Sequence, residues 1–269
     1  MLAVIASAFL ASSSLQSQDP TIPSQITEAY GKLAKKATAL KAEVGDLAFR
    51  KGACLLGGLL KQGGQYTFVV QINEPSAYSV LTGVPGNAPN VELTVKDASG
   101  KNTVTLTDDY GSLFEAKAAG KYTITASNKG AETFVALALV TQSGGMTHPF
   151  TAINAAAASV AAGVKESYQY GYGVPSNQLM ALGAVVEPGG NSGHFTTYNF
   201  PKWLMLAGAD AGPKSFQLTV TDPGTKQSVT ASSEKAYSFC EIDHAITNAA
   251  VSTKNTGSKQ IMYLQAVMR

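Results

Sequence analysis

The chain shows two hydrophobic patterns in succession, the first with the period of a helix and the second with the period of a strand. Between residues 24 and 44 the apolar positions recur at steps of three and four, which predicts an amphipathic helix. These positions are Ile26, Tyr30, Leu33, Ala37, Leu40 and Val44. Ser24 stands where the N-cap is expected. The apolar stripe either packs on the domain that follows or pairs with a copy of itself in an oligomer.

From residue 51 the period changes to two. Tyr66, Phe68, Val70 and Ile72 occupy alternate positions, which predicts a half-buried strand. Similar short runs, separated by turn residues, cover residues 53–60, 76–81, 91–96, 103–107, 113–116, 122–126 and 134–140. Short strands at such spacing are typical of an antiparallel β-sandwich.

One stretch of this pattern occurs twice. Residues 91–105 read VELTVKDASGKNTVT, and residues 216–230 read FQLTVTDPGTKQSVT, with identical residues at seven of the fifteen positions. Each copy has the apolar alternation and central turn of a β-hairpin. Such self-similarity indicates a tandem duplication, in which Leu93 and Leu218 are expected to be buried at matching places.

The rest of the second half follows the first closely enough to divide the chain. Gly183 matches Gly58 and Trp203 matches Tyr78, so Trp203 is expected to fill the core. Residues 151–164 are rich in alanine, which favours a short helix. We therefore predict a mainly β protein: two tandem antiparallel jelly-roll-like β-sandwiches with an N-terminal amphipathic helix and a short helical linker. The expected segments are a signal peptide (1–18), the amphipathic helix (19–46), the first sandwich (47–142), the linker (143–166) and the second sandwich (167–269).

The N-terminus carries an apolar run over residues 2–10, followed by small residues and glutamine. This order is typical of a secretory signal with a cleavage site near Ser13 or Ser14, although no lysine or arginine precedes the run. The alternative is an uncleaved apolar N-terminus that packs or anchors. The run is too short to span a bilayer, so no integral membrane segment is expected after cleavage.

Composition narrows the classes of partner. Only 14% of the residues are charged and the net charge is +2, which gives no electrostatic reason to expect binding to nucleic acid or to an anionic membrane. Cys54 and Cys240 are the two cysteines. They either form a disulfide between the domains after export or remain as two buried thiols.

Residues that could carry chemistry do not form a recognisable constellation. His148, His194 and His244 lie in the linker and in expected turns, without metal-binding spacing, and no nucleophile elbow occurs. Asp108 and Asp109 are weak calcium candidates, since adjacent carboxylates need further oxygen ligands. We therefore predict no catalytic residue, no cofactor and no other metal site.

Three tyrosines alternate in the segment SYQYGYGV: Tyr168, Tyr170 and Tyr172. If this segment is a strand, the three rings project from one face. Such a face could stack against sugar rings or contact a protein. The alternative is that the aromatic face packs on its own sandwich or on the first domain.

Several motifs of the first unit resemble the bacterial pre-peptidase C-terminal domain family. They are GGLL at 57–60 followed by YTF at 66–68, YSVLTG at 78–83, the hairpin at 91–105, and FEAKAAGKYTI at 114–124. The resemblance covers roughly residues 50–141 and is weaker over 178–269. It implies a small jelly-roll sandwich of a secreted, non-catalytic protein, often attached to proteases and sometimes binding polysaccharide or matrix protein. Here Asn90, Val91 and Glu92 stand where the family commonly has an acidic pair.

These observations favour a secreted, non-catalytic structural or binding protein of the cell envelope, surface or extracellular matrix. A protein partner or self-assembly is expected through the helix or through sheet edges. The alternative is a carbohydrate-binding or accessory subunit of a secreted hydrolase.

Overall fold

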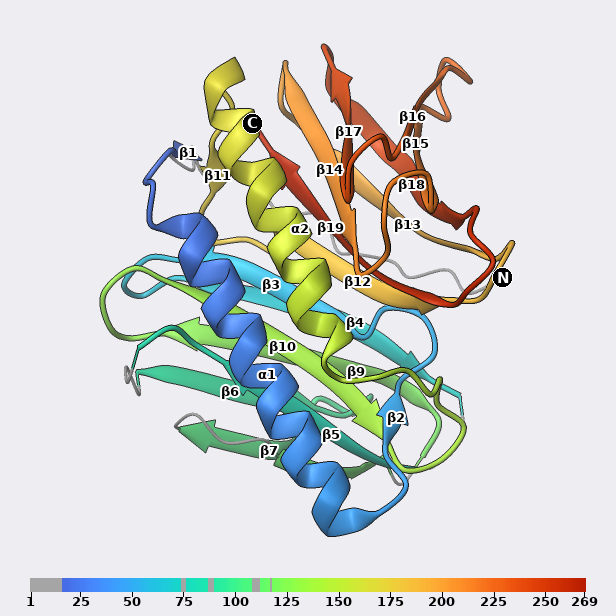
Figure 1. Ribbon diagram of the computed structural model, residues 1–269. Helices are drawn as coiled ribbons and strands as arrows, with labels where there is room; N and C mark the ends of the chain where they lie inside the picture. The colour runs from blue at the N-terminus through green and yellow to red at the C-terminus, as the bar shows by residue number, and fades with distance from the viewer. Residues whose placement is uncertain (1–15, 74–75, 87–89, 108–111, 117) are drawn as a thin grey trace.

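The computed structural model describes residues 16–73, 76–86, 90–107, 112–116 and 118–269. The protein is mainly β, with antiparallel sheets and two helices, as the sequence predicts (Figure 1). Two helices lie side by side on one face of a central sheet, and two smaller sheets pack on its other face. The signal-peptide prediction falls almost entirely on residues 1–15, outside the described residues, and Asp108 and Asp109 also lie outside them.

The central sheet contains nine strands drawn from both halves of the chain. Its hydrogen-bonded order is β17 (Tyr237–Ile242), β14 (Trp203–Ala209), β19 (Ile261–Met268), β12 (Ala181–Val186), β3 (Leu55–Leu60), β10 (Thr133–Thr141), β5 (Ser76–Gly83) and β8 (Ser112–Ala116), with β2 (Ala48–Phe49) also on β10. The halves join where β3 pairs antiparallel with β12, placing Gly57 opposite Ala181. The two sandwiches therefore share one continuous sheet.

Each smaller sheet has four strands in the same relative order. The sheet of the first half is β4 (Gln65–Ile72), β9 (Gly120–Asn128), β6 (Val91–Lys96) and β7 (Asn102–Thr107). The sheet of the second half is β13 (Asn191–Tyr198), β18 (Ile246–Asn255), β15 (Phe216–Thr221) and β16 (Ser228–Ser232). Leu93 on β6 and Leu218 on β15 are both buried, as the repeat predicts. Trp203 is fully buried, and its indole N–H donates to the carbonyl of His244 (2.9 Å).

Helix α1 (Ile22–Val44) packs on β5 and β10, and α2 (Ala152–Ser167) packs on β14 and β19. The two helices run in opposite directions against each other (Figure 1). The apolar stripe of α1 is buried from Ile22 to Ala37 in this arrangement, so that part packs within the chain, whereas Val44 at its end is exposed. Gly83 makes this approach possible, because a Cβ there would lie 2.0 Å from the carbonyl oxygen of Ala29.

The first helix begins two residues before the predicted position, at Ile22. Pro23 fits the first turn of a helix, where its missing N–H costs no hydrogen bond. Asp19 precedes this turn and its carboxylate accepts from the backbone N–H of Thr21 (2.8 Å). Upstream, β1 (Gln16–Ser17) pairs with β11 (Val174–Pro175), which ties the start of the described chain to the second half.

Candidate functional site

The described surface carries a pair of aromatic rings beside the C-terminal end of α2. Beyond α2 the chain forms the short 3-10 helix η1 (Tyr168–Tyr170), which places Tyr170 against Phe239 of strand β17. The two ring centroids are 6.1 Å apart, and Tyr170 is 57% exposed. Because large aromatic side chains usually bury most of their area, an exposed ring of this kind is a candidate contact surface.

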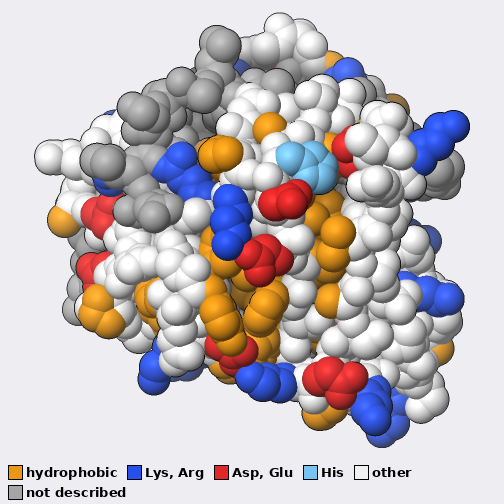
Figure 2. Space-filling model, turned by 90° about the horizontal axis from the view of Figure 1, so that it is seen from above, with side chains coloured by type: hydrophobic (Ala, Val, Ile, Leu, Met, Phe, Trp, Pro, Cys, Tyr) orange, Lys and Arg blue, Asp and Glu red, His pale blue; other side chains and the backbone are white. Residues whose placement is uncertain are grey.

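An ion pair lies on each side of these rings along β17. At one end Lys235 Nζ donates to Glu166 Oε2 (2.5 Å), and the Tyr237 hydroxyl bonds to the same oxygen. At the other end Lys202 Nζ lies 2.7 Å from Glu241 Oε1. We call the set Tyr170, Phe239, Lys202, Glu241, Lys235 and Glu166 the aromatic patch. Figure 2 looks down on this end of the molecule, where charged and hydrophobic side chains lie close together.

The ion pairs fix the charge of the aromatic patch at neutral pH. The hydrogen bond from Lys235 holds the pKa of Glu166 below its ordinary value, and the hydrogen bond from Lys202 does the same for the pKa of Glu241. Both carboxylates are therefore ionised and balanced by a lysine. The patch offers rings, donors and acceptors with no excess of either charge.

The expected strand through the three tyrosines is wrong. Tyr168 and Tyr170 belong to η1, and Gly171 then adopts a left-handed conformation (φ 83°) that ends the helical turn. Tyr170 is exposed, Tyr168 packs partly on the core, and Tyr172 is buried with the Lys202 ammonium 5.2 Å from its ring centroid. The three rings therefore do not share a face, and a binding role for them stays a prediction.

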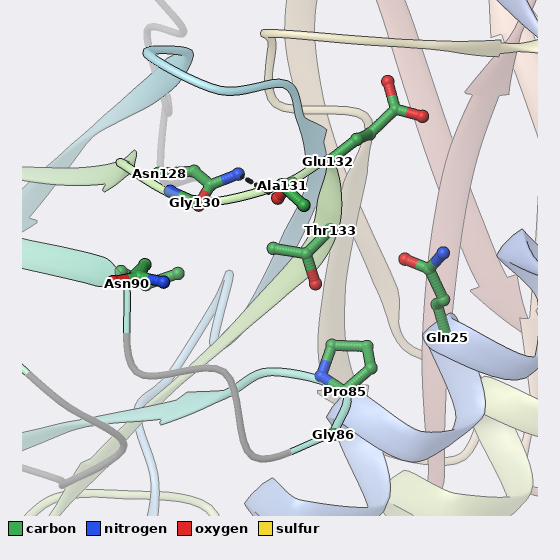
Figure 3. A pocket seen from close by; sticks show the side chains of 10 residues that line it. Gln25, Pro85, Gly86, Asn90, Asn128, Gly130, Ala131, Glu132 and Thr133 are labelled. Atoms are coloured by element: carbon green, nitrogen blue, oxygen red, sulfur yellow. Dashed lines mark hydrogen bonds between the residues drawn. The ribbon is translucent and has the colours of Figure 1, made fainter.

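A shallow groove of about 310 Å³ lies between the first turns of α1 and the β9–β10 turn. We call it the α1 groove and define it by Gln25, Pro85, Gly86, Asn90, Glu132 and Thr133. Figure 3 shows these side chains around the opening, with Glu132 reaching outward from the turn. Nothing in the sequence pattern indicated this groove, because its residues come from four separate segments.

His148 holds the linker on the second sandwich. Its Nε2 lies 2.6 Å from Asp210 Oδ2 and its Nδ1 lies 2.9 Å from Gln260 Oε1. The Gln260 amide nitrogen donates to Glu187 Oε1 (2.7 Å), which turns the amide oxygen toward His148. Burial opposes the charge of His148, but the hydrogen bond and charge of Asp210, with help from Gln260, raise its pKa above the ordinary value.

His194 and the two cysteines, also named as candidates from the sequence, are all buried. His194 lies on β13 and is 8% exposed, whereas the sequence predicted a turn, and its burial lowers its pKa to about 4. Cys54 and Cys240 are buried free thiols, so the disulfide alternative is wrong for this structure. Their positions explain this, since β14, β19 and β12 separate β17 from β3, a span of roughly 19 Å at the usual strand spacing.

In the described part of the chain, no three histidine, cysteine, aspartate or glutamate side chains gather in a way that could hold a metal ion. Neither described helix combines the length and the apolar character needed to cross a bilayer.

Comparisons with known proteins give loose likenesses only. No family model matches the sequence, and no curated protein matches it. The pre-peptidase C-terminal domain of a collagenase from Bacillus anthracis is 15% identical, with a TM-score of 0.29 over 34% of this chain and 93% of that chain. PliG of Aeromonas hydrophila, a periplasmic inhibitor of g-type lysozyme, gives 15% identity and a TM-score of 0.29 over 34% and 86%.

A broader likeness involves oxalate decarboxylase from Lactobacillus farciminis in a formate complex. It covers 84% of each chain, with 13% identity and a TM-score of 0.21. TM-scores this low carry no argument about family or activity.

Proposed function

We propose that the protein is an extracytoplasmic, non-catalytic binding or structural protein that contacts its partner through the aromatic patch. The observation that carries this proposal is the exposed ring of Tyr170, held against Phe239 between two ion pairs. Tyrosine is enriched at protein interfaces because it offers a large ring and a polar tip. A protein partner, or a second copy of this chain, is the occupant that this chemistry favours.

The described titratable groups support a non-catalytic role. Both ring nitrogens of His148 form hydrogen bonds, to Asp210 and Gln260, that hold the linker in place. His194 is buried as a neutral ring. Burial raises the pKa of Cys54 and of Cys240 to about 12, so neither thiol is a ready nucleophile at neutral pH. A catalytic pair needs groups that are both accessible and suitably titrated.

Export is supported by the sequence of the N-terminus. The apolar run over residues 2–10, followed by small residues, is the pattern of a cleaved secretory signal. Cleavage near Ser13 or Ser14 would leave β1 in the mature chain, where it pairs with β11. The mature protein would then keep every described element.

We further propose that the two sandwiches arose by tandem duplication. The strand order of the first half recurs in the second, and matching asparagines close matching turns. Asn128 Nδ2 donates to the carbonyls of Leu60 (3.0 Å) and Ala131 (2.7 Å), and Asn255 Nδ2 donates to those of Val186 (3.0 Å) and Lys259 (2.8 Å). Duplication of one module explains both the recurring strand order and the matching turn asparagines.

The partner proposal is tested by truncating the exposed ring. Tyr170→Ala is compared with wild type by light scattering coupled to size exclusion, and by binding to a glycan array. A lower oligomeric mass for the variant supports a protein interface made by a second copy. Loss of glycan binding favours the alternative, a carbohydrate-binding accessory protein. Phe195→Ala removes a ring that is 44% exposed on β13, outside the patch, and is the matched control. Equal behaviour of Tyr170→Ala and wild type in both assays would contradict the patch as the contact surface.

A further inference from the structure

Strand β17 forms one edge of the central sheet, and among the described strands only β14 pairs with it (Figure 1). Hydrogen-bonded pairs alternate along an antiparallel ladder. In the β14–β17 ladder the N–H of Ala209 donates to the carbonyl of Ala236 (3.1 Å), so the bonded positions of β17 continue with Ser238 and every second residue after it. The main-chain groups that point away from β14 therefore belong to the residues in between, which are Tyr237, Phe239 and Glu241.

This outer row of N–H and C=O groups is available to another strand. No turn or loop that the structure describes forms a main-chain hydrogen bond with Tyr237, Phe239 or Glu241 outside the ladder with β14. An edge strand with free donors and acceptors is a template for pairing with a further strand.

Exposed apolar side chains lie on both faces of the β17 edge. On the helix side Phe239 contacts the exposed ring of Tyr170. On the opposite side the Cys240 thiol donates to the carbonyl of Val229 in β16 (3.5 Å). Val229 is 42% exposed, although Val220, its direct partner in the hairpin, is buried. A strand added beside β17 would therefore find apolar contacts on both of its faces.

We propose that β17 pairs antiparallel with β17 of a second copy, so that the central sheet continues across a two-fold axis. This inference rests on the proposed function, because it names the partner of the aromatic patch. A two-fold interface requires a surface that is complementary to itself, and an antiparallel pair of identical strands has this symmetry. All the outward main-chain groups find partners when Phe239 lies opposite Phe239 of the partner subunit. Tyr237 then lies opposite Glu241 of the partner subunit.

The charges at the two ends of β17 fit this register. Lys235 and Asp243 lie four residues from Phe239 in opposite directions. Lys235 of each subunit therefore faces Asp243 of the partner subunit, and both side chains are largely exposed in the single chain. Opposite charges placed across two strands stabilise their pairing. The same axis brings together the Tyr170–Phe239 ring pairs of both subunits, which concentrates aromatic area at the centre of the interface.

Oligomeric mass and amide exchange test the pairing in the full chain. Light scattering coupled to size exclusion over a range of protein concentrations should show a dimer with a Kd of roughly 10 µM. Hydrogen exchange followed by NMR then reports on the edge itself. The Phe239 N–H should exchange at least about tenfold more slowly in the dimer than in the monomer, whereas the Ser238 N–H, bonded to β14, stays protected at every concentration.

Two variants at Glu241 separate the main-chain bond from the side chain. Glu241→Ala removes the carboxylate, and Glu241→Pro removes both the carboxylate and the outward N–H. Proline is accepted on an edge strand where the N–H points outward, so the fold should be kept. The dimer Kd of Glu241→Pro should exceed that of Glu241→Ala about tenfold, because each dimer loses the hydrogen bond twice.

Exchanging the end charges tests the register. Lys235→Glu and Asp243→Lys should each raise the dimer Kd about fivefold, and the double variant should return it to within about twofold of wild type. Lys235→Glu also repels Glu166 of its own subunit, but this effect persists in the double variant, so recovery reports the contact between subunits. Lys254→Glu makes the same charge change at an exposed site on β18 and should dimerise like wild type.

Four results would overturn the proposal. They are a wild type that stays monomeric at about 200 µM, Phe239 exchange that does not depend on concentration, equal Kd values for the two Glu241 variants, and a double charge variant as weak as the single ones. The proposed function is judged separately. If Tyr170→Ala weakens dimerisation while Phe239 exchange is independent of concentration, the aromatic patch remains the contact surface and only the strand pairing is wrong.

Discussion

His194 occupies in the second sandwich the core position that Phe68 occupies in the first. Each lies four residues beyond a matching turn glycine, Gly64 or Gly190, and each faces the inside of its sandwich. The Nδ1 atom of His194 is buried and has no hydrogen-bond partner among the residues that the structure describes. Nearby, Gln265 and Thr253 bond to each other inside the same sandwich. The second core is therefore partly polar where the first is apolar.

We predict that His194 makes the second sandwich sensitive to acid. Its pKa is about 4 in the folded protein and 6.5 when exposed, so the unfolded chain binds the proton first as the pH falls. Stability is then fully present above about pH 6.5 and decreases as the pH falls toward 4, by roughly 3 kcal/mol at most. Urea unfolding as a function of pH measures this loss.

The first sandwich supplies the control for this prediction. His194→Phe copies Phe68 and should remove most of the acid-dependent loss, whereas Phe68→His should introduce a second one. An acid response of His194→Phe identical to that of wild type would show that His194 is not its source.

His148 should give the opposite pH dependence. Its pKa is raised in the folded state by Asp210, so its contribution is present below about pH 6.5 and is lost as the pH rises through the folded pKa. Asp210→Asn should lower the pKa of His148 in an NMR titration and cost about 3 kcal/mol of unfolding free energy below that pH. His244→Ala removes an exposed histidine beside Asp243 and should change stability by less than about 0.5 kcal/mol.

The two turn asparagines should be equally important for stability. Asn128 and Asn255 are buried, and each Oδ1 also accepts a backbone N–H, from Gly130 and Gly257 respectively, at 2.9 Å. Replacing either by alanine leaves several buried backbone groups unpaired, so we expect a loss of about 2–4 kcal/mol in each case. Asn191→Ala, at an exposed position, should be nearly neutral in the same denaturation assay. A large difference between Asn128→Ala and Asn255→Ala would contradict the equivalence of the turns.

At Gly83 and Gly208 the helices lie so close to the central sheet that an added methyl group should not fit. A Cβ on Gly83 would lie 2.0 Å from Ala29 O, and one on Gly208 would lie 2.7 Å from Val160 N, both backbone atoms. We expect Gly83→Ala to cost about 3 kcal/mol or more, and Gly208→Ala somewhat less, because the helix must move away. Gly212→Ala has open space around it and serves as the control. Melting temperatures rank the three variants. An unchanged melting temperature for Gly83→Ala would contradict the close approach of α1 to Gly83.

Both thiols should resist modification in the native protein. Cys54 and Cys240 are buried, and burial raises the pKa of each to about 12. Iodoacetamide should therefore label neither residue until the chain is unfolded, when both react. Mass spectrometry of the unfolded, unreduced protein distinguishes two free thiols from a disulfide between them. If neither thiol is then labelled until a reductant is added, the two cysteines are bridged.

Local patterns in the sequence determined the elements and most of their buried faces. The steps of three and four place the apolar face of α1 from Ile26 to Ala37 in the core whatever it packs on, although Val44 at the end of the same stripe is exposed. The alternation in β4, and the hairpins that contain Leu93 and Leu218, likewise fix which side chains turn inward. These features depend on neighbours in the chain, which a single sequence shows directly.

Only the tertiary structure decided how distant segments meet. The β3–β12 pairing, the separation of the cysteines and the insertion of His148 beside Asp210 depend on contacts across the two halves, for which the sequence carries no local signal. In β13 the register on β18 sets His194 opposite Val251 and Phe195 opposite Ala250, burying the histidine and exposing the phenylalanine. A shift of one residue would reverse this, because successive strand residues face opposite sides of a sheet.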